Sequence, residues 1–200
     1  MRALLGTVIL LAAAMGCAGA KLDGGRASAM VEIQTSLGTI EVEVQRTAAP
    51  VTAENFLRYV RGGFYDGGRF HRTVTPDNQP GQSVKIEVIQ AGVNPAREKE
   101  EFAPISLERT RSTGLRHEDG AISMARGEPD TATSDFFICI GDQPELDFGG
   151  QRNPDGQGFA AFGRVVKGMD VVRKIQRSPA EGQTLTPPVE ILSIRVRARP

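Results

Sequence analysis

The segment DGAISMARGEPDTATSDFFICIGDQPELD (residues 119–147) contains two short apolar runs, at residues 120–125 and 135–140. Each run is shorter than a typical helix and is bounded by Gly, Pro, Asp or Thr, which favours β-strands. Similar short runs occur elsewhere in the chain. They predict further strands at residues 68–74, 84–90, 159–166 and 189–197.

The segments before and after these runs add a hairpin and two helices. VEIQT and TIEVEV alternate apolar and polar residues around the turn SLG, which predicts a β-hairpin over residues 31–45. The segment APVTAENFLRYVRGGFY predicts a helix with Thr52 as N-cap that ends at Gly62 and Gly63, and MDVVRKIQRS predicts a second helix. Many short strands with only two helices favour a mainly β fold, a closed or nearly closed barrel capped by helices.

Composition restricts the function classes. The chain has 200 residues, 24 Lys and Arg, 24 Asp and Glu, and a pI near 6.8. Such a length suits one domain with its own core. The balanced charge provides no global basic field, so we expect no nucleic-acid partner and no electrostatic binding to a membrane surface.

The first twenty residues, MRALLGTVILLAAAMGCAGA, have the pattern of an export signal, with an early Arg, an apolar run and then small residues. Two processing routes are open. AMGC resembles the bacterial lipobox, in which Cys17 would carry the lipid, whereas AGA would allow cleavage after Ala20. We favour lipidation, since Cys17 has little other reason to stand there. Ala18 after the Cys then favours a periplasmic protein anchored to the outer membrane.

These patterns divide the chain into a signal peptide (1–20), a flexible tether (21–30) and one folded domain (31–200). The second cysteine, Cys139, lies in the apolar run FFICIG and is expected to be a small buried hydrophobe. Two cysteines build no disulfide framework. His117, in the polar turn RHEDG, lacks the spacing of a metal site, so no metal is expected.

Three blocks resemble the cyclophilin family of peptidyl-prolyl cis/trans isomerases, especially its bacterial exported members. They are GGFYDGGRFHRTV, the segment 119–147, and FAAFGRVVKGMDVVRKI. The resemblance covers nearly everything from Val31 to Val196. It implies a closed eight-stranded antiparallel β-barrel with a helix at each end, and an enzyme without cofactors that acts as a monomer on proline-containing unfolded or flexible polypeptides.

The resemblance gives Arg72, the arginine of FHR, the catalytic role. An X-Pro bond prefers trans by only about 0.5–1 kcal/mol, but amide resonance sets a rotation barrier of roughly 18–20 kcal/mol. In the twisted state the prolyl nitrogen loses conjugation and accepts a hydrogen bond. A guanidinium aimed at that nitrogen therefore binds the transition state selectively, and the chemistry needs no nucleophile or metal.

The remaining site residues also follow from the resemblance. Phe137 matches the floor of a proline pocket, and Gln90 matches the glutamine that touches the substrate backbone and steadies the arginine. Ala125 and Arg126 match the edge strand that hydrogen-bonds the peptide main chain. The expected substrate-binding residues are Gln90, Val88, Ala125, Arg126, Phe137, Leu146 and Phe159.

Three departures from the family pattern affect this pocket. The segment TPDNQPGQSVKIEV is an insertion after the arginine, and it places Glu87 and Val88 where Phe and Met are usual. A carboxylate at the rim would pair with Arg72, unless Val84 or Ile86 is the real wall. Asp135 replaces a frequent Gln and removes an amide from the support of the arginine.

Two functions follow. The first is an isomerase for exported or envelope proteins, which depends on Arg72. The alternative is a cyclophilin-like peptide-binding or chaperone module with weak or no turnover, favoured by Glu87, Asp135 and the insertion. His71 alternates with Arg72 on its strand and is expected to pack or hydrogen-bond within the barrel rather than to react.

Overall fold

The computed structural model describes residues 27–197. The expected signal peptide (1–20) and the expected lipidation site Cys17 lie outside this range. The first strand begins at Ser28, so the last residues of the expected tether belong to the folded domain, which starts before Val31. Within the described residues, no helix is both long and apolar enough to cross a membrane.

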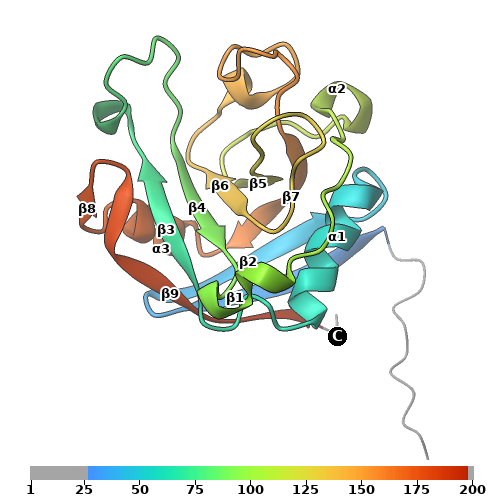
Figure 1. Ribbon diagram of the computed structural model, residues 1–200, viewed down its shortest axis with the longest axis vertical. Helices are drawn as coiled ribbons and strands as arrows, with labels where there is room; N and C mark the ends of the chain where they lie inside the picture. The colour runs from blue at the N-terminus through green and yellow to red at the C-terminus, as the bar shows by residue number, and fades with distance from the viewer. Residues whose placement is uncertain (1–26, 198–200) are drawn as a thin grey trace, which may run out of the picture.

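Eight antiparallel strands close a barrel (Figure 1), as the sequence predicts. Their order is β1-β2-β7-β5-β6-β4-β3-β9, and pairing of β1 with β9 closes the ring; the two-residue strand β8 (Ala180–Glu181) pairs with β9 at the rim. The barrel strands are β1 (Ser28–Thr35), β2 (Gly38–Gln45), β3 (Gly68–Val74), β4 (Val88–Gly92), β5 (Ala121–Met124), β6 (Phe136–Cys139), β7 (Ala160–Lys167) and β9 (Thr184–Arg197).

Two further strands start four or five residues away from their expected bounds. The strand expected at residues 84–90 starts only at Val88, because the buried side chain of Gln79 takes the place of a partner strand for Ile86. Gln79 Nε2 donates to the carbonyl of Ile86 at 2.8 Å, and the Ile86 amide donates to Gln79 Oε1 at 3.3 Å. The last strand starts earlier than residue 189, since its beginning at Thr184 pairs with β3.

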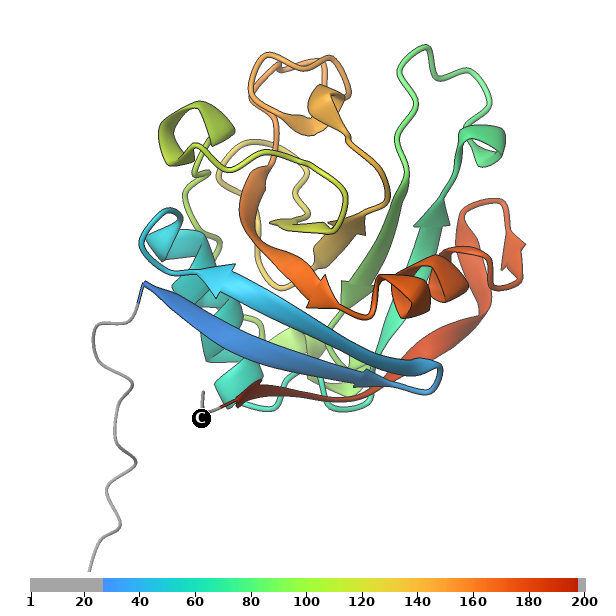
Figure 2. The same cartoon turned by 180° about the vertical axis from the view of Figure 1, so that it is seen from behind.

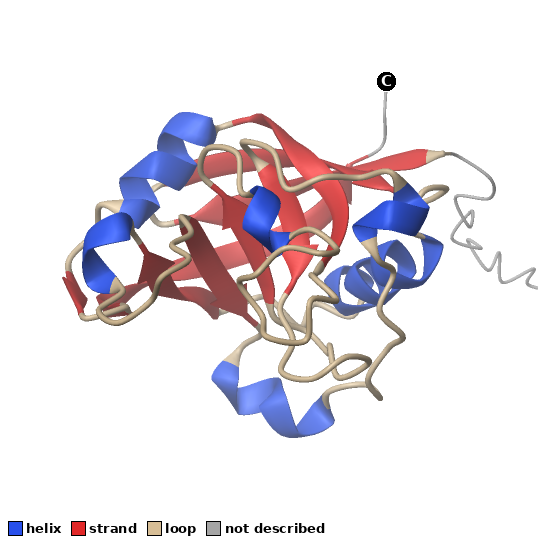
Figure 3. Ribbon diagram, turned by 90° about the horizontal axis from the view of Figure 1, so that it is seen from above, coloured by secondary structure: helices blue, strands red, loops and turns tan. Residues whose placement is uncertain are grey.

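The two longest helices lie on opposite sides of the barrel (Figures 1 and 2), and Figure 3 shows the helices around the strands. They are α1 (Pro50–Arg61) and α3 (Met169–Gln176). The shorter helical segments are α2 (Thr110–Thr113), η1 (Pro76–Asn78), η2 (Pro95–Glu100) and η3 (Pro144–Leu146).

Helix α1 begins at Pro50, so the expectation that Thr52 is the N-cap was wrong. The cap position, Ala49, has no side chain to accept a hydrogen bond. Glu108 takes this role from a distant loop: its carboxylate accepts the amide hydrogens of Val51 at 3.1 Å and Thr52 at 2.7 Å, and the Thr52 hydroxyl at 2.6 Å. A negative charge at this end also suits the helix dipole.

Aromatic rings fill the barrel beneath α1. Phe56 of the helix contacts Phe136 of β6 edge to face at 5.5 Å between ring centroids, and Phe162 of β7 at 5.1 Å. These rings and Tyr65 are fully buried, and the Tyr65 hydroxyl donates to the Ser134 carbonyl at 2.6 Å. In strand β6, which carries the neighbouring residues Phe136 and Phe137, the side chain of Phe136 therefore packs inside the barrel.

Replacing Glu108 by Ala should destabilise the protein by about 1–2 kcal/mol, because two amides and a hydroxyl at the start of α1 lose their acceptor. Chemical denaturation of a protein that starts at Lys21 measures the change. Glu54→Ala is the matched control, since Glu54 lies exposed on the same helix and pairs with Arg61 at the surface. Equal stability losses in the two variants would contradict the capping role.

Candidate functional site

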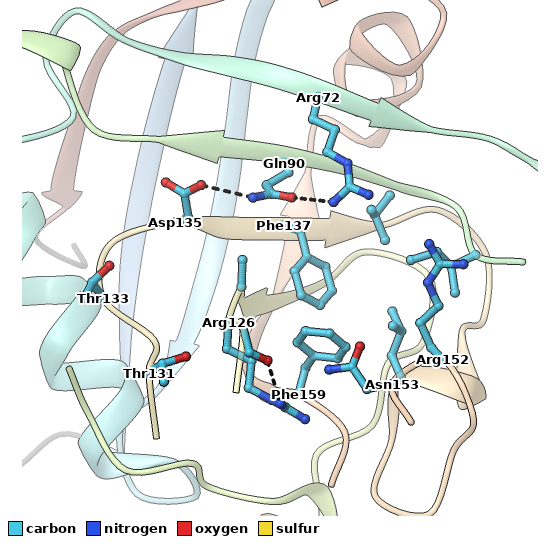
Figure 4. Close-up of a pocket in the computed structure, with 15 residues that line it drawn as sticks. Arg72, Gln90, Arg126, Thr131, Thr133, Asp135, Phe137, Arg152, Asn153 and Phe159 are labelled. Atoms are coloured by element: carbon cyan, nitrogen blue, oxygen red, sulfur yellow. Dashed lines mark hydrogen bonds between the residues drawn. The ribbon is translucent and has the colours of Figure 1, made fainter. Parts of the chain in front are cut away.

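A cavity of about 430 Å³ opens on the outer face of β4, β5 and β6 (Figure 4). Every residue that the sequence analysis assigned to catalysis or substrate binding lines this cavity. Its lining consists of Arg72, Ile86, Val88, Gln90, Ala125, Arg126, Gly127, Thr131, Thr133, Asp135, Phe137, Leu146, Arg152, Asn153 and Phe159.

Phe137 forms the floor of the cavity because successive residues of a strand face opposite ways. Phe136 points into the barrel, whereas Phe137 joins a separate apolar cluster outside it. The ring of Phe159 meets Phe137 edge to face, with centroids 5.4 Å apart. Val88 and Leu146 belong to the same cluster, so the cavity has an apolar base that excludes water from a small ring.

His117 supports this floor from below, a role that the sequence did not reveal. Although it belongs to a polar turn, it is only 1% exposed, and its ring stacks on Phe137 at 5.9 Å. Nδ1 lies 2.7 Å from Asp147 Oδ1, and Nε2 lies 3.0 Å from Ser123 Oγ. Because Ser123 is fully buried, no substrate reaches its hydroxyl, and the three polar groups serve to fix the ring.

Arg72 extends over the cavity from β3 and is held by side-chain amides. Its Nη1 donates to Gln90 Oε1 at 3.0 Å, while Nε and Nη2 both donate to Gln183 Oε1, at 2.9 and 2.6 Å. A guanidinium has five N–H donors. Among the residues that the structure describes, these three hydrogen bonds leave one N–H on each terminal nitrogen of Arg72 available to a ligand.

Gln90 links the arginine to Asp135 on the other side. Its Nε2 donates to Asp135 Oδ2 at 3.0 Å (dashed in Figure 4), so its oxygen must face Arg72. Burial raises the pKa of Asp135, and the hydrogen bond from Gln90 opposes that shift. Asp135 was expected to weaken the support of the arginine, but it contributes to that support by fixing the orientation of Gln90.

His71 lies beside Asp135, with Nε2 at 3.6 Å from Oδ2, and is partly exposed. The expectation that it packs or hydrogen-bonds within the barrel was wrong as to place, because its partner Asp135 lines the cavity outside the barrel. The pairing register of β3 shifts between Phe70 and Arg72, and such a bulge breaks the simple alternation of side chains. The bulge is why both His71 and Arg72 reach the Gln90–Asp135 pair.

Gln183 was not anticipated as a site residue. It belongs to the turn between β8 and β9, and its Nε2 donates to the carbonyl of Asn78 in the insertion at 3.0 Å. The side chain of Asn78 in turn donates to the carbonyls of Thr73 and Gly182, at 3.0 and 3.1 Å. The insertion therefore orients the amide that clamps Arg72.

Glu87 does not reach the cavity, so the expected carboxylate at its rim was wrong. Its Oε2 accepts a hydrogen bond from Gln176 of α3 at 2.9 Å, on the opposite side of the chain. Ile86 and Val88, on either side of it, line the cavity instead. The open alternative that Ile86 forms the wall is confirmed, and the argument for a module weakened by Glu87 loses its basis.

The side chain of Arg126 is hydrogen-bonded to the loop that contains Asp155 and Gly158. Its guanidinium, 1% exposed, bonds both oxygens of Asp155 at 2.7 and 3.0 Å and the carbonyl of Gly158 at 2.8 and 2.6 Å. It also lies 5.0 Å from the ring of Phe159. The main-chain role expected for Ala125 and Arg126 stays a prediction, while the Arg126 side chain shapes the cavity wall.

Within the described residues, no group of three His, Cys, Asp or Glu side chains could hold a metal ion. Cys139 lies under the cavity floor in the same cluster as Phe137 and is fully buried, as expected. Burial raises the pKa of its thiol far above the ordinary value, which keeps it protonated and unreactive.

Comparisons with known proteins agree with this architecture. The family model "Cyclophilin type peptidyl-prolyl cis-trans isomerase" matches residues 30–196. A peptidyl-prolyl cis-trans isomerase of Acinetobacter baylyi is 36% identical over 178 residues, 86% of this chain and 87% of the relative. Peptidyl-prolyl cis-trans isomerase A of Dickeya dadantii is 41% identical over 155 residues, 77% and 74% of the two chains.

A solved structure shows the same fold. The crystal structure of a cyclophilin type peptidyl-prolyl cis-trans isomerase from Cryptosporidium parvum superimposes with a TM-score of 0.70 at 21% identity. The match covers 86% of this chain and 99% of that one.

Proposed function

The chain belongs to the cyclophilin-type peptidyl-prolyl cis-trans isomerase family, and we propose that Arg72 drives its reaction by hydrogen-bonding the nitrogen of the twisted prolyl amide. The family membership makes the protein an isomerase of proline-containing polypeptides. The proposal concerns how this chain lowers the barrier and where it works.

The neutral clamp around Arg72 carries the proposal. Its hydrogen-bond partners, Gln90 and Gln183, orient the guanidinium without cancelling its charge, as a carboxylate would. The available N–H groups then meet the prolyl nitrogen only when rotation has turned its lone pair out of conjugation. Such a donor binds the transition state more tightly than either planar ground state, which is the condition for catalysis.

The apolar cavity supplies a second contribution. The twisted amide is less polar than the planar forms, because it has lost the charge separation of amide resonance. A dry surface of Phe137, Leu146 and Val88 therefore favours it over water. One well-placed donor is worth roughly 3–4 kcal/mol, so the apolar surface and the orientation of the peptide must provide the remainder of the rate enhancement.

Replacing Arg72 by Ala should lower kcat/KM about 100-fold or more, because the transition state loses its charged donor. NMR exchange or a protease-coupled assay with a short X-Pro peptide measures the loss. Arg69→Ala, an exposed arginine of the same strand, serves as control and should keep parental activity. An Arg72→Ala enzyme as fast as the parent would disprove the proposed mechanism.

Replacing Gln183 by Ala should lower kcat about tenfold and leave KM nearly unchanged, since the substitution frees the guanidinium to sample unproductive orientations without removing it. Steady-state kinetics separates the two constants. Gln82→Ala, an exposed glutamine of the insertion, provides the control. A change confined to KM would show that Gln183 contributes to binding rather than to orienting Arg72.

We further propose that the protein works in the bacterial cell envelope on exported polypeptides, with Cys17 as a lipid-bearing N-terminus. The signal pattern of residues 1–20 supports this proposal. Mass spectrometry of the mature protein, expressed from the full chain in a two-membrane bacterium, should find a lipidated N-terminal cysteine that Cys17→Ser abolishes. A mature chain that begins at Lys21 without lipid would contradict the anchor.

A further inference from the structure

Besides Arg72 and Arg126, the cavity is lined by an arginine that the proposed reaction does not use. Arg152 follows η3 in the loop that runs alongside the apolar cluster, and it lines the cavity together with Arg72. Figure 4 shows both side chains on the same side of the Phe137 ring, away from Arg126.

Arg152 is fixed in place from one side only. Its Nη1 donates to Gln79 Oε1 at 2.8 Å and to the carbonyl of Val84 at 2.7 Å, and its backbone amide donates to the carbonyl of Glu145 at 3.1 Å. Within residues 27–197, its Nε and Nη2 donate to no other residue. The insertion thus holds the guanidinium at the cavity and leaves part of its hydrogen-bonding capacity unused.

The charge of Arg152 also has no counter-ion within residues 27–197. No carboxylate of the described part of the chain lies within ion-pair distance of it, in contrast to Arg126, which Asp155 neutralises at 2.7 Å. Asp135, the carboxylate of the cavity lining, is bonded to Gln90. Burial lowers the pKa of both Arg72 and Arg152, and the positive charge of Arg152 lowers the pKa of Arg72 further, since the two like charges face one cavity.

An anionic group on the substrate would relieve this repulsion. A carboxylate that approaches Arg152 gains a charge-assisted hydrogen bond in a partly desolvated site, where attraction exceeds that in bulk water. A substrate cation at the same place would meet two arginines. The site therefore both attracts one class of side chain and repels another, and both effects contribute to specificity.

We propose that Arg152 is a specificity-determining residue that selects proline-containing segments with an Asp or Glu side chain next to, or one residue away from, the proline. The inference rests on the proposed function, because it assumes that the isomerised bond lies over Phe137 and beneath Arg72. It assigns to the insertion a role in choosing substrates.

The test uses four pairs of X-Pro peptides. Each pair carries one Glu, or one Gln as its neutral counterpart, at one of four positions: the two before the proline and the two after it. For at least one position the parent should isomerise the Glu peptide about fivefold more efficiently, in kcat/KM, than the Gln peptide. Arg152→Gln should bring this ratio to about one. Arg164→Gln, which removes an exposed arginine of β7 and the same charge, should keep the ratio.

Equal rates for Glu and Gln at all four positions would overturn the inference, as would a ratio that survives Arg152→Gln. A lower Tm of Arg152→Gln would show that the substitution loosens the loop. In that case Arg152→Lys and added salt test whether the charge of Arg152 causes the preference for Glu. The Lys variant should keep most of the preference, and high salt should reduce it in the parent. The Arg72→Ala enzyme tested in parallel distinguishes the two proposals, since its loss of activity reports on the mechanism, whereas a Glu to Gln ratio that persists in it and disappears in Arg152→Gln reports on Arg152.

Discussion

The guanidinium of Arg72 is held by two amide oxygens and, within residues 27–197, by no carboxylate, and the rest of the site is arranged around this constraint. Gln90 presents its oxygen to the arginine because Asp135 accepts its NH2 group. Gln183 also presents its oxygen to the arginine, because the carbonyl of Asn78 accepts a hydrogen bond from the NH2 group of Gln183. Each amide is thus oriented by an acceptor behind it, and the charge of Arg72 stays available to the substrate.

The insertion after β3 is part of the site rather than an obstruction of it. Asn78 orients the clamp of Arg72, and Gln79 replaces a strand partner for Ile86 while it holds Arg152. A buried glutamine can do this because its amide both donates and accepts, which satisfies backbone groups that no strand reaches. One loop therefore shapes the apolar wall and places two arginines at the same cavity.

The sequence predicted the barrel because alternation and short apolar runs report directly on strands, and the resemblance brought Arg72, Gln90 and Phe137 to one cavity. It missed Gln183, which stands 111 positions from Arg72 in a turn without a distinctive pattern. The sequence analysis wrongly placed Glu87 at the cavity rim. After an insertion the register of a strand is uncertain, and the strand pattern alone does not show whether Glu87 or its neighbour faces the pocket. The sequence analysis read His117 as a turn residue, since its burial arises from tertiary contacts with Asp147, Ser123 and Phe137.

The central claim is that Arg72 stabilises the twisted amide and not the bound peptide. NMR exchange on a saturated complex measures the interconversion rate of the enzyme-bound cis and trans forms, and a titration of the same X-Pro peptide gives Kd. For Arg72→Ala the account predicts a bound-state rate at least about 100-fold slower, with Kd changed by less than about threefold. A large rise in Kd with an unchanged bound-state rate would show that Arg72 binds the substrate and would contradict the account.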